Sequence, residues 1–385
     1  MVAFCIIPVV AASLLAQDAQ ITRDAQGWTR TSSGTVSGVP LRVIKLSTRG
    51  HVILRGSPGE QITYKLTQHV HARSEEEAHR TFGHVTSMIP RNGMTVVTLL
   101  PTARENVNSE WEINVPRRVA GILVDTQLGD VEAYDIESSL HIDTTAGQIR
   151  CDRIRGGVDA KTGGGEIRMG KIGGAVHCTS AAGSIFVDSA GGEANCQTVG
   201  GEIQIHEAAG ALVLSTEGGN IQVDKCAGSV QAHTGAGVIQ VVQAGGMVWA
   251  DTRGGSIEVG SSRGAQCQSG AGTIRVKTST GPLRVQTALG SILAELLSGA
   301  RLEDSSLVAG SGDITVLIPA NLALSVLARN DTGANPRIVS DFSEVRAKNV
   351  GFSRPPLVYE GSINGGGPLL SINTAGGIIY VRKLK

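Results

Sequence analysis

The chain repeats the motif Gly-x-Ile-x-Val at a fixed interval of 18 residues through most of its middle part. We call the first glycine of each copy the marker glycine. The interval is unbroken over the first eight copies and becomes 17, 18 and 22 residues in the last three. The marker glycines are Gly129, Gly147, Gly165, Gly183, Gly201, Gly219, Gly237, Gly255, Gly272, Gly290 and Gly312. A single period of this kind is typical of repeat proteins, in which each unit buries its apolar side by stacking on the next.

Each copy contains two short segments in which apolar and polar residues alternate. The first follows the marker glycine, and its isoleucine is replaced only in the first copy, by Val131. The second precedes the marker glycine and ends in threonine or serine, as in Leu212, Leu214 and Thr216. Alternation with a period of two places one side of a strand in the core. A further glycine, nine residues before the marker in most copies, marks the turn between the segments. The sequence therefore predicts two strands per 18 residues.

Stacked copies place each residue beside its equivalent 18 positions later, so that similar side chains form columns. Isoleucine and valine form one wall of the predicted core, and smaller alanine, cysteine and valine residues the other. We therefore predict an all-β fold, a single-chain parallel β-solenoid (β-helix) with 18-residue, two-strand rungs and capped ends. The 51 glycines among 385 residues, and an aromatic content of only 3%, agree with small side chains and many tight turns. An antiparallel sandwich competes, but it requires no fixed column identities.

The sequence divides into four predicted segments. Residues 1–19 are predicted as a signal peptide, 20–120 as an N-terminal cap with strands and one short helix, 121–318 as the regular solenoid, and 319–385 as an irregular segment with a C-terminal closing rung. The apolar start has the length of a signal sequence, although no lysine or arginine precedes it, and a buried N-terminal strand is the alternative. The predicted mature chain has no apolar run long enough for a transmembrane helix.

The ends of the chain are variations on the same unit. Residues 50–54 form a degenerate copy of the motif, and Ser74 with Glu77 forms a capping box that opens the short helix. Residues 370–381 keep the spacing of the repeat after a less regular stretch, so they are predicted as the final rung. Caps are needed because an open solenoid exposes unpaired strand edges.

The sequence resembles a known family. The Gly-x-Ile-x-Val rungs, the N-terminal segment with its short helix, and the closing Gly361-Ser-Ile-Asn-Gly-Gly-Gly-Pro and Thr374-Ala-Gly-Gly-Ile-Ile are similar to the bacterial putative-adhesin β-strand-repeat family, a family of unknown function. The resemblance extends from about Leu41 to the C-terminus. It implies a repetitive surface protein with a role in adhesion, and it supplies no catalytic residues.

One group of residues combines acids and imidazoles on the outer surface of the predicted solenoid. His141, Asp159 and His177 share an outward column on successive rungs, and Asp143 lies in the neighbouring column with Asp125. A metal ion or an acid–base pair would require such groups within a few ångströms. Because rungs are about 4.8 Å apart, the two histidines are too distant to share one ion without bending towards Asp159. A solvated polar face is the alternative interpretation, and we therefore predict no catalytic residue and no metal site.

Other candidates are weaker. Cys178 and Cys196 share an inward column and are either buried thiols or a disulfide. His69 and His71 project from one side of a segment, which suggests a metal site or simply a polar surface. Gly-x-Ser-x-Gly at residues 260–264 matches a nucleophile elbow, but no helical pattern follows it. The sequence predicts no cofactor.

These observations favour a non-enzymatic protein of the cell envelope or exterior that binds a surface ligand, either a glycan or a protein. Lysine plus arginine (34) equals aspartate plus glutamate (34), so the basic footprint of a nucleic-acid binder is missing. Two alternatives remain. The first is a carbohydrate-active β-helix enzyme, a polysaccharide lyase or hydrolase, and the second is an intracellular structural scaffold. The sequence does not predict the oligomeric state.

Overall fold

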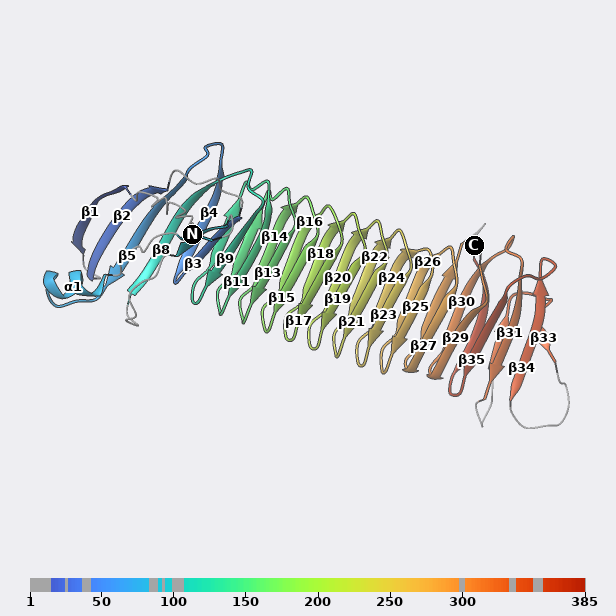
Figure 1. Cartoon of the computed structure of the whole chain (residues 1–385). Helices are drawn as coiled ribbons and strands as arrows, with labels where there is room; N and C mark the ends of the chain where they lie inside the picture. The colour runs from blue at the N-terminus through green and yellow to red at the C-terminus, as the bar shows by residue number, and fades with distance from the viewer. Residues whose placement is uncertain are drawn as a thin grey trace, which may run out of the picture. The chain divides into compact units, whose positions relative to one another are not determined.

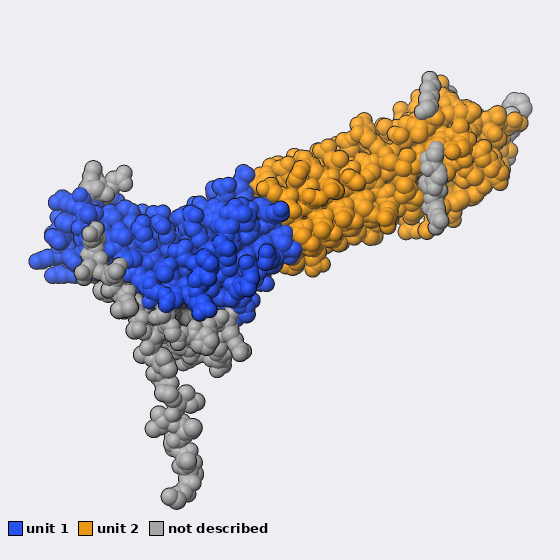
Figure 2. Space-filling view, turned by 90° about the horizontal axis from the view of Figure 1, so that it is seen from above, with its two compact units in different colours: residues 1–174 blue, residues 175–385 orange. Residues whose placement is uncertain are grey.

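The computed structural model describes residues 15–24, 27–36, 43–82, 89–91, 94–98, 107–297, 302–331, 337–348 and 356–384. The chain divides into two compact units, Met1–Gly174 and Ala175–Lys385, shown in Figure 2. The fold is an all-β solenoid, as predicted, and the described residues include one short helix (Figure 1). Most of the predicted signal peptide, residues 1–14, lies outside the described residues.

Unit 2 contains two parallel sheets whose strands alternate along the chain. Successive strands of sheet A are β16 (Ile185–Ala190), β18 (Ile203–Ala208), β20 (Ile221–Cys226), β22 (Ile239–Ala244), β24 (Ile257–Ser262), β26 (Ile274–Ser279), β28 (Ile292–Leu296) and β30 (Ile314–Pro319). Those of sheet B are β15 (Val176–Ser180), β17 (Ala194–Thr198), β19 (Leu212–Thr216), β21 (Val230–Thr234), β23 (Val248–Thr252), β25 (Ala265–Ser269), β27 (Leu283–Leu289) and β29 (Ser305–Ser311).

The predicted isoleucine column forms the core of sheet A in this unit. Ile203 pairs with Ile221, and Ile221 with Ile239, in parallel register. Each of the three side chains is at most 1% exposed. The inward assignment of this column is therefore confirmed, and burial of each such side chain contributes about 1.5–3 kcal/mol of transfer free energy.

The sheet A strands extend beyond the recognised motif to a corner that the sequence analysis missed. After Val223, two consecutive side chains, Asp224 and Lys225, point outward before Cys226 returns to the core. Equivalent positions in neighbouring rungs carry the small buried residues Ala208 and Ala244. Seven residues after most marker glycines there is thus a further inward position, at the corner between the two sheets.

At the C-terminal end of unit 2, the strands are stacked in an order that differs from their order in the sequence. The last strands of the chain, β35 (Leu369–Thr374) and β36 (Ile378–Leu384), pair in parallel with β29 and β30, as the repeat spacing predicts. On their other sides they pair with β31 (Leu324–Asn330) and β32 (Arg337–Ser340). The rung formed by residues 369–384 is therefore stacked between the rung of β29 and β30 and the rung formed by residues 324–340 (Figure 1).

The outer edge of this end is covered by antiparallel strands. β34 (Leu357–Ile363) runs antiparallel along β31, and the short β33 (Arg346–Ala347) pairs with β34. We expected residues 370–381 to close the solenoid. Instead the irregular segment that precedes them in sequence provides the cap, and antiparallel pairing ends the parallel stack.

Unit 1 combines regular rungs with the N-terminal cap. Its sheet B contains β3 (Val43–Thr48), β6 (Ile89–Arg91), β7 (Met94–Thr98), β9 (Gly121–Thr126), β11 (Ser139–Thr144) and β13 (Val158–Thr162). Its sheet A contains β1 (Leu15–Asp24), β2 (Gly27–Val36), β4 (His51–Ser57), β5 (Ile62–Val70), β8 (Val107–Pro116), β10 (Val131–Tyr134), β12 (Ile149–Asp152) and β14 (Ile167–Ile172). The degenerate copy at residues 50–54 stacks as predicted, because β4 pairs in parallel with β10.

The cap extends sheet A with strands of changed direction. β8 pairs in parallel with β4, and antiparallel pairings then join β8 to β5, β5 to β2, and β2 to β1. The helix α1 (Glu75–Thr81) has the predicted capping box, in which the Ser74 hydroxyl accepts a 3.2 Å hydrogen bond from the Glu77 backbone N–H. Ala78 and Phe82 pack against Val70 in a small core below the helix.

Candidate functional site

Two members of the predicted cluster of acids and imidazoles lie side by side in unit 1. His141 and Asp159 are neighbours on β11 and β13, and His141 Nδ1 lies 3.0 Å from Asp159 Oδ2. Both side chains are about half exposed. His177 lies on β15 in unit 2, so its position beside Asp159 stays a prediction. Within the described part of the chain no three metal-ligating side chains converge, and an exposed pair of this kind contributes at most about 1 kcal/mol.

The acidic column beside this pair is balanced by lysines. Asp143 is in register with Asp125 on one side and with Lys161 on the other. Asp125 also forms a 3.1 Å ion pair with Lys45. Lysines therefore flank both ends of the Asp125–Asp143 column, an arrangement that suits a solvated surface better than a general acid.

Unit 2 contains two further imidazole–carboxylate pairs that the sequence analysis did not single out. His206 Nδ1 lies 2.8 Å from Asp224 Oδ2, and His233 Nδ1 lies 3.2 Å from Asp251 Oδ2. The hydrogen bond to Asp224, with the charge of Asp188 adding to it, raises the pKa of His206 above its ordinary value. Each pair has the 18-residue spacing of the repeat, a signal that could have identified it.

The described cysteines are buried and are poor nucleophiles. Cys151, Cys178, Cys196, Cys226 and Cys267 are all buried thiols, and Cys178 and Cys196 are register partners as predicted. Burial raises the pKa of the Cys267 thiol to about 12, and it raises the pKa of Cys151 still further. Because the thiolate is the reactive form, these groups act as small apolar residues.

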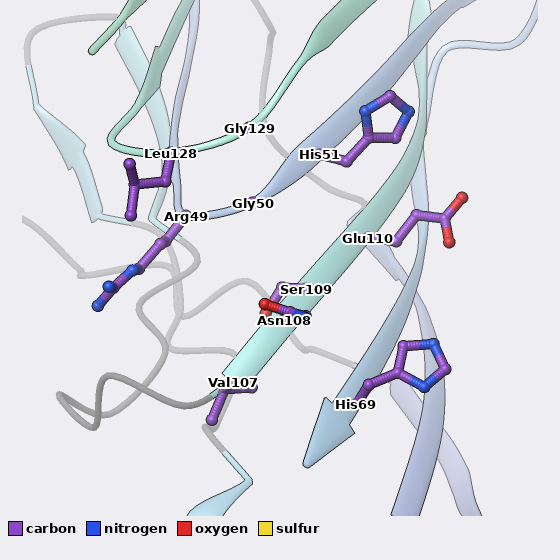
Figure 3. A pocket seen from close by; sticks show the side chains of 10 residues that line it. All are labelled: Arg49, Gly50, His51, His69, Val107, Asn108, Ser109, Glu110, Leu128 and Gly129. Atoms are coloured by element: carbon purple, nitrogen blue, oxygen red, sulfur yellow. The ribbon is translucent and has the colours of Figure 1, made fainter. Parts of the chain in front are cut away.

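A pocket of about 530 Å³ opens in the cap of unit 1 (Figure 3). His51 and Glu110 are cross-strand partners on β4 and β8, and their side chains project to the same side as that of His69 on β5. His69 Nδ1 is 2.9 Å from the hydroxyl oxygen of Thr29. The predicted partner of His69, His71, follows the end of β5 and does not line this pocket. The pocket offers polar groups but no metal-ligating set among the described residues.

The remaining motif of the sequence analysis has no catalytic context. Ser262 is the last residue of β24, and β25 begins at Ala265, so the motif joins two strands. The hydroxyl of Ser262 is buried. A nucleophile elbow requires an exposed hydroxyl between a strand and a helix, and this segment has neither feature.

The outer surface of sheet B in unit 2 is the most regular polar surface that the structure describes. We call it the amide face and define it as the two central outward positions of each strand from β15 to β27. Its members are His177, Thr179, Asn195, Gln197, Val213, Ser215, Gln231, His233, Trp249, Asp251, Gln266, Gln268, Arg284 and Gln286. Asp251 is its one carboxylate and Arg284 its one guanidinium, and amides are the commonest side chains.

The outer surface of sheet A in the same unit differs in character. Lys225 pairs with Glu207 at 2.8 Å, and Lys277 pairs with Glu258 at 2.6 Å. A ladder of glutamines is also present, since Gln204, Gln222 and Gln240 are consecutive register partners, but charged residues surround it. One surface of unit 2 is thus charged and internally paired, whereas the other is nearly neutral.

No protein-family model matches this sequence, and no curated protein matches it either. Two solved structures match the chain at low similarity. A putative cell adhesion protein from Clostridium sporogenes is 8% identical over 97% of this chain and 100% of its own, with a TM-score of 0.18. A putative adhesin from Bacteroides fragilis is 12% identical over 92% of this chain and 97% of its own, with a TM-score of 0.24. At these scores the likeness has no weight in assigning a function. Among the described helices none could span a membrane.

Proposed function

We propose that the protein is a non-enzymatic β-solenoid of the cell envelope or exterior that adheres to a surface ligand through its outer faces. The observation that carries this proposal is the amide face. It presents polar side chains at regular intervals on one sheet, with two exposed apolar side chains, Val213 and Trp249, each 40% exposed. Such a surface can make many weak contacts with a repetitive partner.

The internal structure of the rungs supports a presenting role. Inward columns of isoleucine, valine and threonine keep neighbouring parallel strands in register, as between β18 and β20 and between β19 and β21, so the outward side chains are held in rows. A rigid surface loses little conformational entropy on binding. Export remains part of the proposal, and it is supported by the apolar sequence of residues 1–16.

The proposal is tested by adhesion and by turnover. Beads coated with the full purified chain are passed over surfaces bearing dextran, galactomannan or collagen, and retention under flow is compared with that of albumin-coated beads. We expect retention on at least one surface. Retention on none would contradict the proposal.

The enzymatic alternative is tested with the same preparation. Polysaccharides are incubated with the chain, and new reducing ends and unsaturated products are measured. Turnover that disappears in the Asp143→Asn or Asp159→Asn variant would replace the adhesion proposal with a hydrolase or lyase. Fractionation followed by N-terminal sequencing tests export, and an uncleaved intracellular chain would favour the scaffold alternative.

A further inference from the structure

We propose that the amide face of unit 2 binds a neutral polysaccharide, with Trp249 as the stacking platform and Gln231 and Gln266 as flanking hydrogen-bonding groups. The inference rests on the proposed function, because it names the ligand class of a surface which that function uses. The supporting observations are the order of residues along one column, the exposure of these residues and the distribution of charge.

The column crosses consecutive strands without interruption. Val213 is in register with Gln231, Gln231 with Trp249, Trp249 with Gln266, and Gln266 with Arg284. Adjacent strands lie about 4.8 Å apart. A polymer that lies along this column therefore meets one new side chain at each strand, at a spacing comparable with the length of one pyranose residue.

The chemistry of the column suits a sugar chain. A carboxamide offers both donors and an acceptor, and so does a sugar hydroxyl, so each glutamine can make paired hydrogen bonds with one residue of the polymer. The indole of Trp249 is 40% exposed on the same surface. Large aromatic rings contribute much of the energy of an interface, and an exposed indole can stack on the apolar C–H face of a pyranose.

The second outward column of the same face adds hydrogen-bonding groups. Ser215 is in register with His233, and Gln268 is in register with Asp251 on one side and Gln286 on the other. His233 and Asp251 are paired with each other. The two columns together flank the indole with side chains that can bind hydroxyl groups.

Charge distinguishes a neutral polymer from an acidic one. The column holds one cation, Arg284, and the adjacent column holds one anion, Asp251. An acidic polysaccharide needs a cation near each of its carboxylates or sulfates, and the amide face has no such row of cations. A protein partner would need a contiguous apolar centre, whereas Val213 and Trp249 are separated by Gln231. A neutral glycan is therefore favoured.

The test is affinity electrophoresis of the full chain in native gels that contain a polysaccharide. The neutral probes are mixed-linkage β-glucan, galactomannan and dextran, and polygalacturonate is the acidic probe. We expect retardation by at least one neutral probe and none by polygalacturonate. In the Trp249→Ala variant the dissociation constant should rise about tenfold or more, because a truncated aromatic anchor is costly. Trp249→Phe should restore most of the binding.

Two matched variants control for general effects. Phe186→Ala removes an aromatic side chain from the outer surface of sheet A, and Gln240→Ala removes an exposed amide from the same surface. Both should bind as the parent does, whereas Gln231→Ala should weaken binding. Thermal melting by circular dichroism verifies that each variant is folded, which is expected because all four side chains point away from the core.

The outcomes separate the ligand class from the function. Retardation by no neutral probe, or equal retardation of the parent and of Trp249→Ala, would overturn the inference. If beads are retained on collagen while the gels show no retardation, the adhesion proposal stands and the glycan inference fails. Retardation accompanied by turnover would retain the glycan and reject the non-enzymatic function. Retardation by polygalacturonate alone would show that the polymer is acidic and that the inference is wrong.

Discussion

The Thr216 hydroxyl donates a 2.8 Å hydrogen bond to the carbonyl oxygen of Gly201, the marker glycine of the neighbouring rung. The same hydroxyl accepts a 3.2 Å hydrogen bond from the backbone N–H of Gly219. One buried oxygen thus satisfies two backbone groups at the turn between the sheets. The contact to a marker glycine carbonyl recurs from Thr144, Thr162, Thr198, Thr234, Thr252, Ser269, Thr287 and Thr374.

Replacing Thr216 with valine should destabilise unit 2. The substitution keeps the shape but leaves the Gly201 carbonyl and the Gly219 N–H without their partner, and an unsatisfied buried group costs about 1–3 kcal/mol. Urea unfolding followed by circular dichroism measures the loss. Thr216→Ser keeps the hydroxyl and should recover most of the stability, and Ser215→Ala, on the outer surface, should change little. A valine variant as stable as the parent would show that the hydroxyl ladder is dispensable.

Adjacent glycines should respond differently to alanine. A Cβ atom on Gly219 would lie 2.0 Å from the backbone oxygen of Gly201, whereas on Gly218 its nearest neighbour would be 3.8 Å away. Because the close atom belongs to the backbone, Gly219→Ala must displace a rung and should cost about 1–3 kcal/mol or more. Gly218→Ala should be close to neutral. Equal melting temperatures for the two variants would contradict this account of the marker glycine.

A charge in the isoleucine column should be strongly destabilising. Ile221 is 1% exposed, so Ile221→Asp places an unpaired carboxylate in the core and should cost several kcal/mol. Val199 is 58% exposed, and Val199→Asp is the matched control. In thermal unfolding, Ile221→Asp should melt at a clearly lower temperature than Val199→Asp. If Ile221→Asp melts with the control, Ile221 does not face the core.

The His206–Asp224 pair should make stability depend on pH in a defined direction. The hydrogen bond to Asp224 raises the pKa of His206 above 6.5, so its stabilising contribution is fully present below pH 6.5 and is lost as pH rises through the folded-state pKa. Hydrogen bonds from Gln222 and His206 lower the pKa of Asp224, so its contribution is fully present above pH 3.8 and is lost as pH falls through the lowered folded-state pKa.

NMR titration of the His206 ring measures this effect directly. We expect a pKa above 6.5 in the parent, and a lower value in the Asp224→Asn variant, because the carboxylate that stabilises the imidazolium is removed. The His233 ring provides an internal reference, since it contacts Asp251 and not Asp224. An unchanged His206 titration in the variant would mean that the pair does not form in solution.

Removing one whole rung should preserve the fold. Deletion of Gly210–Ala227 removes 18 residues and joins Ala209 to Gly228, which occupies the position that Gly210 held. Gly210 and Gly228 have equivalent surroundings, since each approaches the backbone of the rung before it. Nearest-neighbour stacking makes stability close to a sum over rungs, so we expect a folded β protein with modestly lower stability.

Deleting half of that segment should not be tolerated. Removal of Gly210–Gly218 would place a sheet A strand, with its isoleucine, where β19 of sheet B belongs. Every later strand would change sheets, and this variant should aggregate or unfold. Equal behaviour of the 9-residue and 18-residue deletions by circular dichroism and size-exclusion chromatography would show that 18 residues is not the structural repeat.

The inward half of this protein could be predicted from its sequence because its environment repeats. Ile221, Thr216 and Gly219 each meet the same neighbours at every rung, so the same residue types recur and the period is visible. The outward columns face water, which imposes no common requirement on them. For that reason His206 and Asp224 were not singled out, whereas the column that joins His141 to Asp159 follows from the repeat. The place of His177 beside them stays a prediction.

The order of strands at the ends of the chain was decided only by the tertiary structure. The strands β31 and β35 both alternate between buried and outward residues, so either could stack on β29 as far as local pattern is concerned. The later strand, β35, occupies that place, and β31 lies outside it because β34 covers its free edge. The sequence by itself determined which side of each strand is buried and the length of the repeat, since both follow from local alternation. Which edge a strand joins depends on pairings between residues far apart in the chain, and these exist only in the folded protein.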